Sequence, residues 1–188
     1  MNFYPKKSLG QNFLNDNKII NLIAEIGNIT HNDSILEVGP GTGKLTEKIL
    51  EKKPLKITVI EKDERLTKLL SKKFEEKINI INQDILNFSF NNYLNNKLII
   101  FGNLPYNIST QILVKWIRME NLDQFCKRFI LMFQKEVADR ILSKYNSSNY
   151  GRLTIIANWK LDIKKIVDIK PNSFSPKPKI DSSLLFFS

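Results

Sequence analysis

The sequence contains few of the side chains that bind metals or form covalent intermediates. Its 188 residues include one cysteine, Cys126, and one histidine, His31. One cysteine cannot form an intrachain disulfide, which fits a protein kept in a reducing, cytoplasmic setting. No spacing pattern pairs this cysteine with the histidine for nucleophilic catalysis, so we expect Cys126 to be structural. We also expect no bound metal.

Long apolar runs are missing as well. No run approaches the roughly 20 residues that a transmembrane helix needs, and the N-terminus lacks the apolar centre of a signal peptide. We therefore expect no membrane association. Hydrophobic residues make up 42% of the chain, which is enough to bury one core of ordinary size. The sequence predicts a single domain spanning residues 1–188.

Acidic residues are fewer than basic ones, and the formal net charge is +10. The excess is uneven, because residues 110–188 carry 14 basic and 7 acidic side chains whereas residues 1–109 carry 15 and 12. The second half is therefore the expected face for a polyanion, whose binding would weaken steeply with salt. Candidates for phosphate contacts are Lys115, Arg118, Lys127, Arg128, Lys144 and Arg152.

Strand and helix patterns alternate along most of the chain. Asp16 can cap a first helix that ends at Gly27. Strands are expected at residues 34–38, 57–60, 78–81, 98–101 and 129–133. One further helix follows the turn at residues 39–43 and ends at residue 50, and others are expected at 64–74, 108–117 and 134–142. The tail segments 153–159, 163–169 and 182–187 are more strand-like and predict a hairpin at the sheet edge. This order indicates an α/β fold with a parallel sheet, which binds ligands above its strand ends.

Glycine is scarce, and three of the seven glycines fall within residues 39–43, Gly-Pro-Gly-Thr-Gly. Missing β-carbons at such a turn let a ligand approach the backbone. A P-loop is excluded because Lys44 is followed by Leu45, and a dinucleotide fingerprint needs a glycine where Lys44 stands. With Glu37 just before it, the turn resembles the first motif of S-adenosylmethionine-dependent methyltransferases. A tight turn without a ligand is the alternative.

Acidic residues follow the next two expected strands. Glu61 ends the second strand, where a carboxylate can accept hydrogen bonds from both ribose hydroxyls of a nucleotide-like cofactor. Asp84 follows the third strand, where it can accept from the cofactor's adenine amine while Ile85 packs on the ring. Either acid alone would more often be a solvated charge. Their positions at successive strand ends favour a shared cofactor site.

A polar and aromatic segment follows the fourth strand. Asn103, Leu104, Pro105 and Tyr106 come directly after the apolar run at residues 98–102. The Asn103 side-chain carbonyl and the Leu104 backbone carbonyl can accept hydrogen bonds from an exocyclic amine, and the Tyr106 ring can stack on its base. Pro105 stiffens the turn and removes a backbone donor. The segment therefore predicts a pocket for an adenine amine.

Five segments together resemble the rRNA adenine N6-dimethyltransferase family, most closely its small-subunit (16S) branch. They are residues 7–14, 101–110, 134–140, 150–153 and 174–182. The resemblance covers nearly the whole chain. It implies a Rossmann-like class I S-adenosylmethionine-dependent methyltransferase, with a mostly parallel seven-stranded sheet, helices on both faces and an antiparallel C-terminal hairpin. Family members usually continue beyond a position like Ser188 into a small helical domain, which is absent from this sequence.

The resemblance also implies roles for individual residues. It places Tyr106 and Phe174 on the two faces of the target base, with Asn103, Leu104 and Pro105 beside its amine. Without the resemblance, Phe174 would be interpreted as a plug over the core. The implied contacts to S-adenosylmethionine, whose product is S-adenosylhomocysteine, come from Asn12, Leu14, Gly39, Gly41, Glu61, Asp84, Ile85 and Asn103.

The implied activity is dimethylation of two adjacent adenosines in the 3′-terminal hairpin of small-subunit rRNA. The expected partner is the precursor of the small ribosomal subunit, and we expect a monomer. Two main alternatives remain: a large-subunit rRNA methyltransferase of the macrolide-resistance type, and a non-catalytic RNA-binding assembly or transcription factor on the same fold. DNA adenine methylation is a weaker third alternative. An intact glycine turn, two acids and Asn103 with Tyr106 weigh against a non-catalytic protein.

Overall fold

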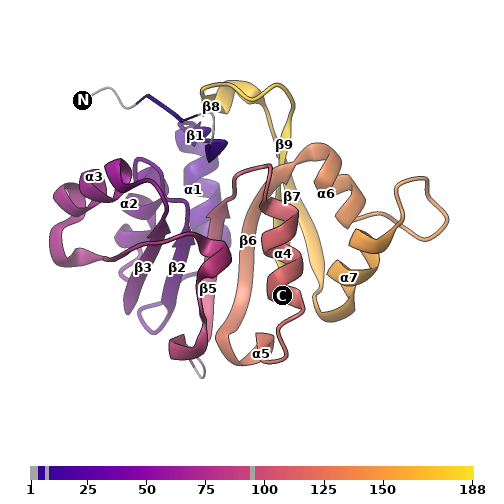
Figure 1. Cartoon of the computed structure of the whole chain (residues 1–188), viewed down its shortest axis with the longest axis horizontal. Coiled ribbons are helices and arrows are strands. Elements are labelled where there is room, and N and C mark those ends of the chain that lie inside the picture. Colours follow the sequence, from indigo (N-terminus) through magenta and orange to yellow (C-terminus); the bar gives the residue numbers. More distant parts are fainter. Residues whose placement is uncertain (1–3, 7–8, 94–95) are drawn as a thin grey trace.

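The computed structural model describes residues 4–6, 9–93 and 96–188. A seven-stranded sheet forms its centre, in the order β4-β3-β2-β5-β6-β9-β7 (Figure 1). The five strands from β4 to β6 run parallel, and β9 is antiparallel to both β6 and β7. The strand bounds are β2 Ser34–Val38, β3 Lys56–Glu61, β4 Asn79–Asn82, β5 Leu98–Asn103, β6 Cys126–Gln134, β7 Ile163–Ile169 and β9 Ser182–Phe187.

Helices cover both faces of this sheet. The helix bounds are α1 Asn17–Ile26, α2 Lys44–Glu51, α3 Glu64–Phe74, α4 Ser109–Ile117, α5 Leu122–Phe125, α6 Lys135–Ile141 and α7 Arg152–Lys160. Short 3-10 turns are η2 Glu75–Lys77, η3 Ile85–Asn87, η4 Asn91–Tyr93 and η5 Pro171–Ser173. No helix among the described residues has the length and apolar character needed to cross a bilayer.

The alternation of side chains along β5 explains the two layers. Leu98 and Ile100 pack into a core cluster with α4 to α7, whereas Ile99 and Phe101 pack into a second cluster with α1 to α3. Successive residues of a strand point to opposite faces, so a strand buried on both faces must be apolar throughout. The predicted α/β fold, with its seven-stranded, mostly parallel sheet and antiparallel C-terminal strands, is confirmed.

Strand order places the ligand edge between β2 and β5. The chain leaves β2 for β3 and β4 on one side and then returns to β5 on the other. Val38 pairs with Gly102, so the glycine turn after β2 and Asn103 at the end of β5 are neighbours. An open parallel sheet binds its ligands at the point where the strand order reverses.

One predicted element was wrong. Residues 153–159 were expected to be strand-like, but they lie in helix α7, which packs against α4 and α6. The Gly151 backbone N–H donates to Thr154 Oγ1 at 3.2 Å at the start of this helix. Leu153 and Ala157 are buried on the inner face, while Ile155 and Trp159 are exposed on the other side. Apolar residues on both sides hide a helical period.

A second small sheet was not predicted. Strand β1 (Phe13–Leu14) pairs antiparallel with β8 (Phe174–Ser175), joining the N-terminal segment to the loop before β9. The Asn15 backbone N–H also donates to Ser173 O at 2.8 Å. These bonds hold residues 9–14 beside the carboxyl ends of the parallel strands.

Candidate active site

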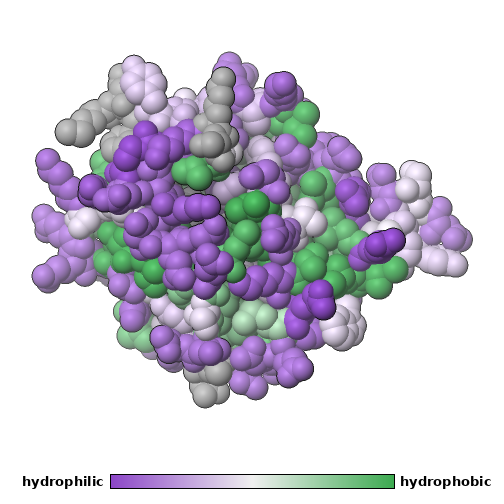
Figure 2. Space-filling view, viewed as in Figure 1, coloured by the Kyte–Doolittle hydropathy of each residue, from purple (hydrophilic) through white to green (hydrophobic). Residues whose placement is uncertain are grey.

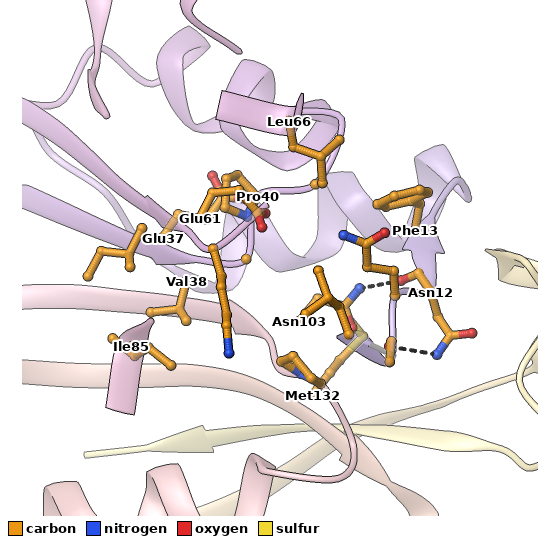
Figure 3. A pocket seen from close by; sticks show the side chains of 18 of the residues that line it. Asn12, Phe13, Glu37, Val38, Pro40, Glu61, Leu66, Ile85, Asn103 and Met132 are labelled. Carbon is orange, nitrogen blue, oxygen red and sulfur yellow. Dashed lines mark hydrogen bonds between the residues drawn. The ribbon is translucent and has the colours of Figure 1, made fainter. Parts of the chain in front are cut away.

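A cavity of about 280 Å³ opens at the carboxyl ends of β2 to β5. Its volume is close to the lower end of the range for small-molecule sites, about 300–1,000 Å³. Residues 9–14 of the N-terminal segment line it together with the loops that follow these strands. Figure 3 shows Pro40 and Glu61 on one side and Asn12 and Asn103 on the other.

The glycine turn forms one wall of the cavity. Gly39 and Gly41 have φ angles of +68° and +57°, a region that side chains other than glycine rarely adopt. A β-carbon on Gly41 would lie 2.8 Å from Phe13 Cδ1, and one on Gly39 would lie 3.6 Å from Asn103 O. Glycine therefore lets the turn approach both the N-terminal segment and the end of β5.

Glu61 is held at the end of β3 by backbone donors. Its Oε1 accepts from the Asp63 backbone N–H at 2.9 Å. Burial raises the pKa of Glu61, and hydrogen bonds from the backbone N–H groups of Asp63 and Gly41 partly offset that effect. The carboxylate lines the cavity in a fixed orientation, as an acceptor of ribose hydroxyls requires.

Asp84 lies at the next strand end and is also held in place. Its Oδ1 accepts from the Leu86 backbone N–H at 2.9 Å, and its Oδ2 accepts from Lys62 Nζ at 2.8 Å. The Lys62 hydrogen bond, followed by the one from Leu86, lowers the pKa of Asp84. Ile85 lines the cavity beside it. No sequence pattern indicated that Lys62 would take part.

Asn103 carries the most informative contact of the site. Its Nδ2 donates to the Asn12 backbone carbonyl at 2.8 Å (Figure 3). Only the NH₂ group of an amide can donate to a carbonyl, so this bond fixes the orientation of the side chain. The Oδ1 atom is then the free end, and among the described residues it accepts no hydrogen bond.

The two residues after Asn103 differ in their exposure to the cavity. Pro105 lines it, whereas the Leu104 side chain is buried beside Gly102 and does not. Across the described part of the chain, no protein donor contacts the Leu104 carbonyl. Leu104 is thus not among the residues that line the cavity, and the role of its backbone carbonyl as an acceptor stays a prediction.

Tyr106 lines the cavity and is anchored by its hydroxyl. Tyr106 Oη and Ser182 Oγ lie 2.6 Å apart, which ties the ring to the start of β9. Burial raises the pKa of Tyr106, so the hydroxyl stays neutral. A ring held at its far end can present a flat face to a base without losing further rotational freedom.

Phe174 is placed differently from the other expected site residues. Its side chain is 3% exposed, it packs in the core cluster of α1 to α3, and it does not line the cavity. Pairing of β8 with β1 sets it opposite Leu14. In this conformation Phe174 is a plug over the core, and its stacking on a base stays a prediction.

Glu37 is a cavity residue to which the sequence assigned no role of its own. It is fully buried beneath the glycine turn and accepts from Thr46 Oγ1 at 2.6 Å. Burial raises its pKa to about 7, the Thr46 hydrogen bond opposes this, and the nearby Glu61 carboxylate adds to it. A carboxyl group with such a pKa can change its charge near neutral pH.

Asp63 links the N-terminal segment to helix α3. Its carboxylate, which is shielded from solvent, accepts from Arg65 at 2.6 Å, from Gln11 Nε2 at 3.0 Å and from Lys6 Nζ at 3.4 Å. The Arg65 hydrogen bond is the main reason that the pKa of Asp63 lies far below its usual range. Because Gln11 lines the cavity, this cluster positions the segment that carries Asn12. Sequence spacing cannot reveal a contact across 52 residues.

The geometry can be compared with known proteins. The family described as ribosomal RNA adenine dimethylase matches residues 2–186. The chain belongs to this family. It is 58% identical to the ribosomal RNA small subunit methyltransferase A of Pelagibacter ubique, over 97% of this chain and 70% of that protein. The Ehrlichia ruminantium protein of the same name is 42% identical over 96% of this chain and 69% of its own length.

Solved structures confirm the predicted class I methyltransferase fold. A dimethyladenosine transferase from Plasmodium falciparum superposes with a TM-score of 0.81 at 30% identity, covering 93% of this chain and 62% of that one. The 23S rRNA methyltransferase ErmE superposes with a TM-score of 0.77 at 26% identity, covering 94% and 69%.

Family membership makes the chain an rRNA adenine dimethyltransferase that uses S-adenosylmethionine and acts on RNA. The cavity fits this cofactor. Glycines at positions 39 and 41 leave room at the backbone, and the acidic residues Glu37, Glu61 and Asp84 line the same cavity as acceptors for its polar groups. The product left behind is S-adenosylhomocysteine.

Proposed function

We propose that this protein methylates N6 of two adjacent adenosines in the 3′-terminal hairpin of small-subunit rRNA, acting as a cytoplasmic monomer on the precursor of the small ribosomal subunit. The relatives at 58% and 42% identity, both named as small subunit methyltransferases, support the small-subunit target. The large-subunit alternative rests on a more distant likeness of 26% identity. The domain at residues 1–188 carries the chemistry, and the family's helical domain would add contacts to the ribosomal particle.

The Asn103 amide carries this proposal. Its NH₂ group is occupied by the Asn12 carbonyl, so Oδ1 is left to accept a hydrogen bond from the target amine. The Leu104 carbonyl is a second acceptor on the same turn. Adenine N6 is a weak nucleophile because its lone pair is delocalised into the ring. Two acceptors fixed in advance favour a more tetrahedral, electron-richer nitrogen, at no further cost in reorganisation.

The remaining roles follow from the walls of the cavity. The bound cofactor supplies an electrophilic methyl group on its sulfonium. Asn12, Leu14, Gly39 and Gly41 shape the space around it, Glu61 accepts from its ribose, and Asp84 with Ile85 receives its adenine. Tyr106 stacks on the target base, and stacking of this kind is worth roughly 1–3 kcal/mol per base. Extrusion of the base from its stack has a cost that this contact helps to offset.

Transfer of tritium from labelled S-adenosylmethionine tests the proposal. Small subunits that lack the modification should accept label, and mapping should place N6,N6-dimethyladenosine at two neighbouring positions near the 3′ end. Large subunits offered in parallel should accept none. Label found only in large-subunit rRNA would favour the macrolide-resistance type, and no label in either would favour a non-catalytic RNA-binding factor.

A further inference from the structure

A continuous stretch of the surface carries basic side chains and no acidic ones. Residues 140–161 contain four lysines and arginines and no aspartate or glutamate. This stretch, here called the 140–161 surface, includes the end of α6, a protruding loop and helix α7 (Figure 1). Its basic residues, all exposed, are Arg140, Lys144, Arg152 and Lys160.

Aromatic rings are exposed on the same surface. Tyr145 is 76% exposed and Trp159 is 66% exposed, and Tyr150 lies edge-on to Tyr145 with the ring centres 5.7 Å apart. On α7, Arg152, Ile155 and Trp159 follow one another at helical spacing and share the outer face. Pale and green side chains lie among purple ones on this side of the molecule (Figure 2). Large rings left in water among cations are typical of surfaces that bind single-stranded nucleic acid.

Three of the four basic groups here form no ion pair among the described residues, whereas two other candidates for phosphate contacts are already engaged. Lys115 Nζ donates to Leu86 O, and Lys127 forms a 2.6 Å ion pair with Asp33. By contrast, within the described ranges Arg140, Lys144 and Arg152 form no salt bridge. Lys160 Nζ donates to Met119 O at 2.9 Å and lies 4.8 Å from the centre of the Trp159 ring, so it is held as a cation beside that ring.

The 140–161 surface is connected to the wall of the active-site cavity. Tyr106 is hydrogen-bonded to Ser182 at the start of β9. Asp181, the residue before Ser182, accepts a hydrogen bond from the Lys135 backbone N–H at the start of α6, at 2.9 Å. Helix α6 has seven residues and is therefore about 10 Å long, and it leads directly to the loop. The 140–161 surface therefore begins one short helix away from the cavity wall, beyond the α6 carboxylates Glu136 and Asp139.

We infer that the 140–161 surface binds single-stranded rRNA next to the target adenosine. Trp159 and Tyr145 stack on unpaired bases, and Arg140, Lys144 and Arg152 contact phosphates. Charge complementarity selects RNA over a protein partner, since four cations without a single carboxylate suit a polyanion. This inference rests on the proposed rRNA substrate and adds the surface that holds it outside the cavity.

Tryptophan fluorescence gives a direct test. The chain has two tryptophans, and Trp116 is fully buried while Trp159 is exposed. Titration with an unmethylated RNA oligonucleotide of the small-subunit 3′-terminal sequence should quench the Trp159 emission. The Trp159→Phe variant should show no quenching, because only Trp116 remains. A fully duplex RNA of equal length should quench far less, and equal quenching would overturn the assignment to single strands.

Affinity measurements complete the test. Trp159→Ala and Tyr145→Ala should each weaken RNA binding about tenfold. In the double variant Lys144→Gln with Arg152→Gln, the slope of log affinity against log salt concentration should become shallower by about 0.7 for each phosphate that the protein no longer neutralises. Leu55 is also apolar and exposed but lies far from residues 140–161 in the sequence, so the Leu55→Ala variant should bind RNA like the wild type. Thermal unfolding midpoints show whether each variant is folded.

The outcomes separate this inference from the proposed function. Wild-type RNA affinity in the folded Trp159 and Tyr145 variants would overturn the inference even if methyl transfer to small subunits is observed, and would leave the surface to a protein partner. Quenching of Trp159 by single-stranded RNA without methyl transfer to any rRNA would support the surface and refute the proposed function.

Discussion

Replacing Glu37 by glutamine should remove a pH dependence of stability that the active site builds into this fold. Glu37 is fully buried, and burial raises its pKa from an ordinary 4.5 to about 7. In the unfolded chain the group ionises near its ordinary pKa. The folded state therefore holds a proton that the unfolded state has already released, and its stability falls as the pH rises towards 7.

The size of this effect follows from the two pKa values. Their difference, at about 1.4 kcal/mol per pH unit, corresponds to about 3 kcal/mol of unfolding free energy. Most of it should be lost between about pH 5 and pH 8. Glutamine at position 37 can still accept the Thr46 hydrogen bond but cannot ionise, so Glu37→Gln should lack this loss.

Urea unfolding of both proteins across this pH range is the assay. The difference in unfolding free energy between Glu37→Gln and the wild type should increase by about 2–3 kcal/mol from pH 5 to pH 8 in favour of the variant. Taking the difference between the proteins cancels other titrating groups that they share. Parallel pH profiles would refute the reasoning and show that Glu37 ionises normally in the folded state.

Three further predictions concern the cofactor site and the stability of the fold. Affinity for S-adenosylmethionine, measured by calorimetry, should rise as the pH passes 7 because a cationic ligand favours ionised Glu37, and this slope should vanish in Glu37→Gln. Asp63→Asn keeps a helix N-cap but loses the ionic contact to Arg65, so cofactor affinity should fall about tenfold, and an unchanged affinity would exclude a positioning role. Gly43→Ala places a β-carbon 2.5 Å from the Phe74 ring at a φ of +76°, and it should destabilise the fold by about 1–3 kcal/mol. As a control, the β-carbon of Gly151→Ala meets nothing within 4 Å, so this variant should keep the wild-type unfolding midpoint.

The central sheet was predictable because its strands are buried on both faces. Segments such as residues 98–101 are apolar throughout, and glycine or acidic residues occur at the ends of the strands. Local sequence then specifies both the strand and the ligand-binding turn that follows it. For this reason Gly39, Glu61, Asp84 and Asn103 could be assigned to one cavity from the sequence.

Helix α7 was not predictable from local pattern. Its buried residues Leu153 and Ala157 pack on α4 and α6, but Ile155 and Trp159 are equally apolar and exposed. A sequence-based prediction assumes that apolar residues point inwards, and here that assumption fails. The exposed rings are instead explained by an RNA-binding surface.

Long-range contacts could not be predicted from the sequence either. The bonds from Gln11 to Asp63 and from Asn103 to Asn12 join residues 52 and 91 positions apart. Burial of Phe174 depends on the pairing of β8 with β1, two strands of two residues each. Such short strands carry no periodicity, so only tertiary structure shows where the ring lies.

Single-turnover methyl transfer by Asn103→Ala, at saturating S-adenosylmethionine and with undermethylated small subunits, tests the central claim most directly. Saturation removes any effect of the missing bond to Asn12, and Asn32→Ala in an exposed turn serves as the matched control. Loss of one fixed hydrogen-bonding group at the reacting centre should slow the transfer about 100-fold or more, with the control unaffected. A wild-type rate in the folded, cofactor-saturated variant would contradict the role of the Asn103 carbonyl in activating the adenine amine.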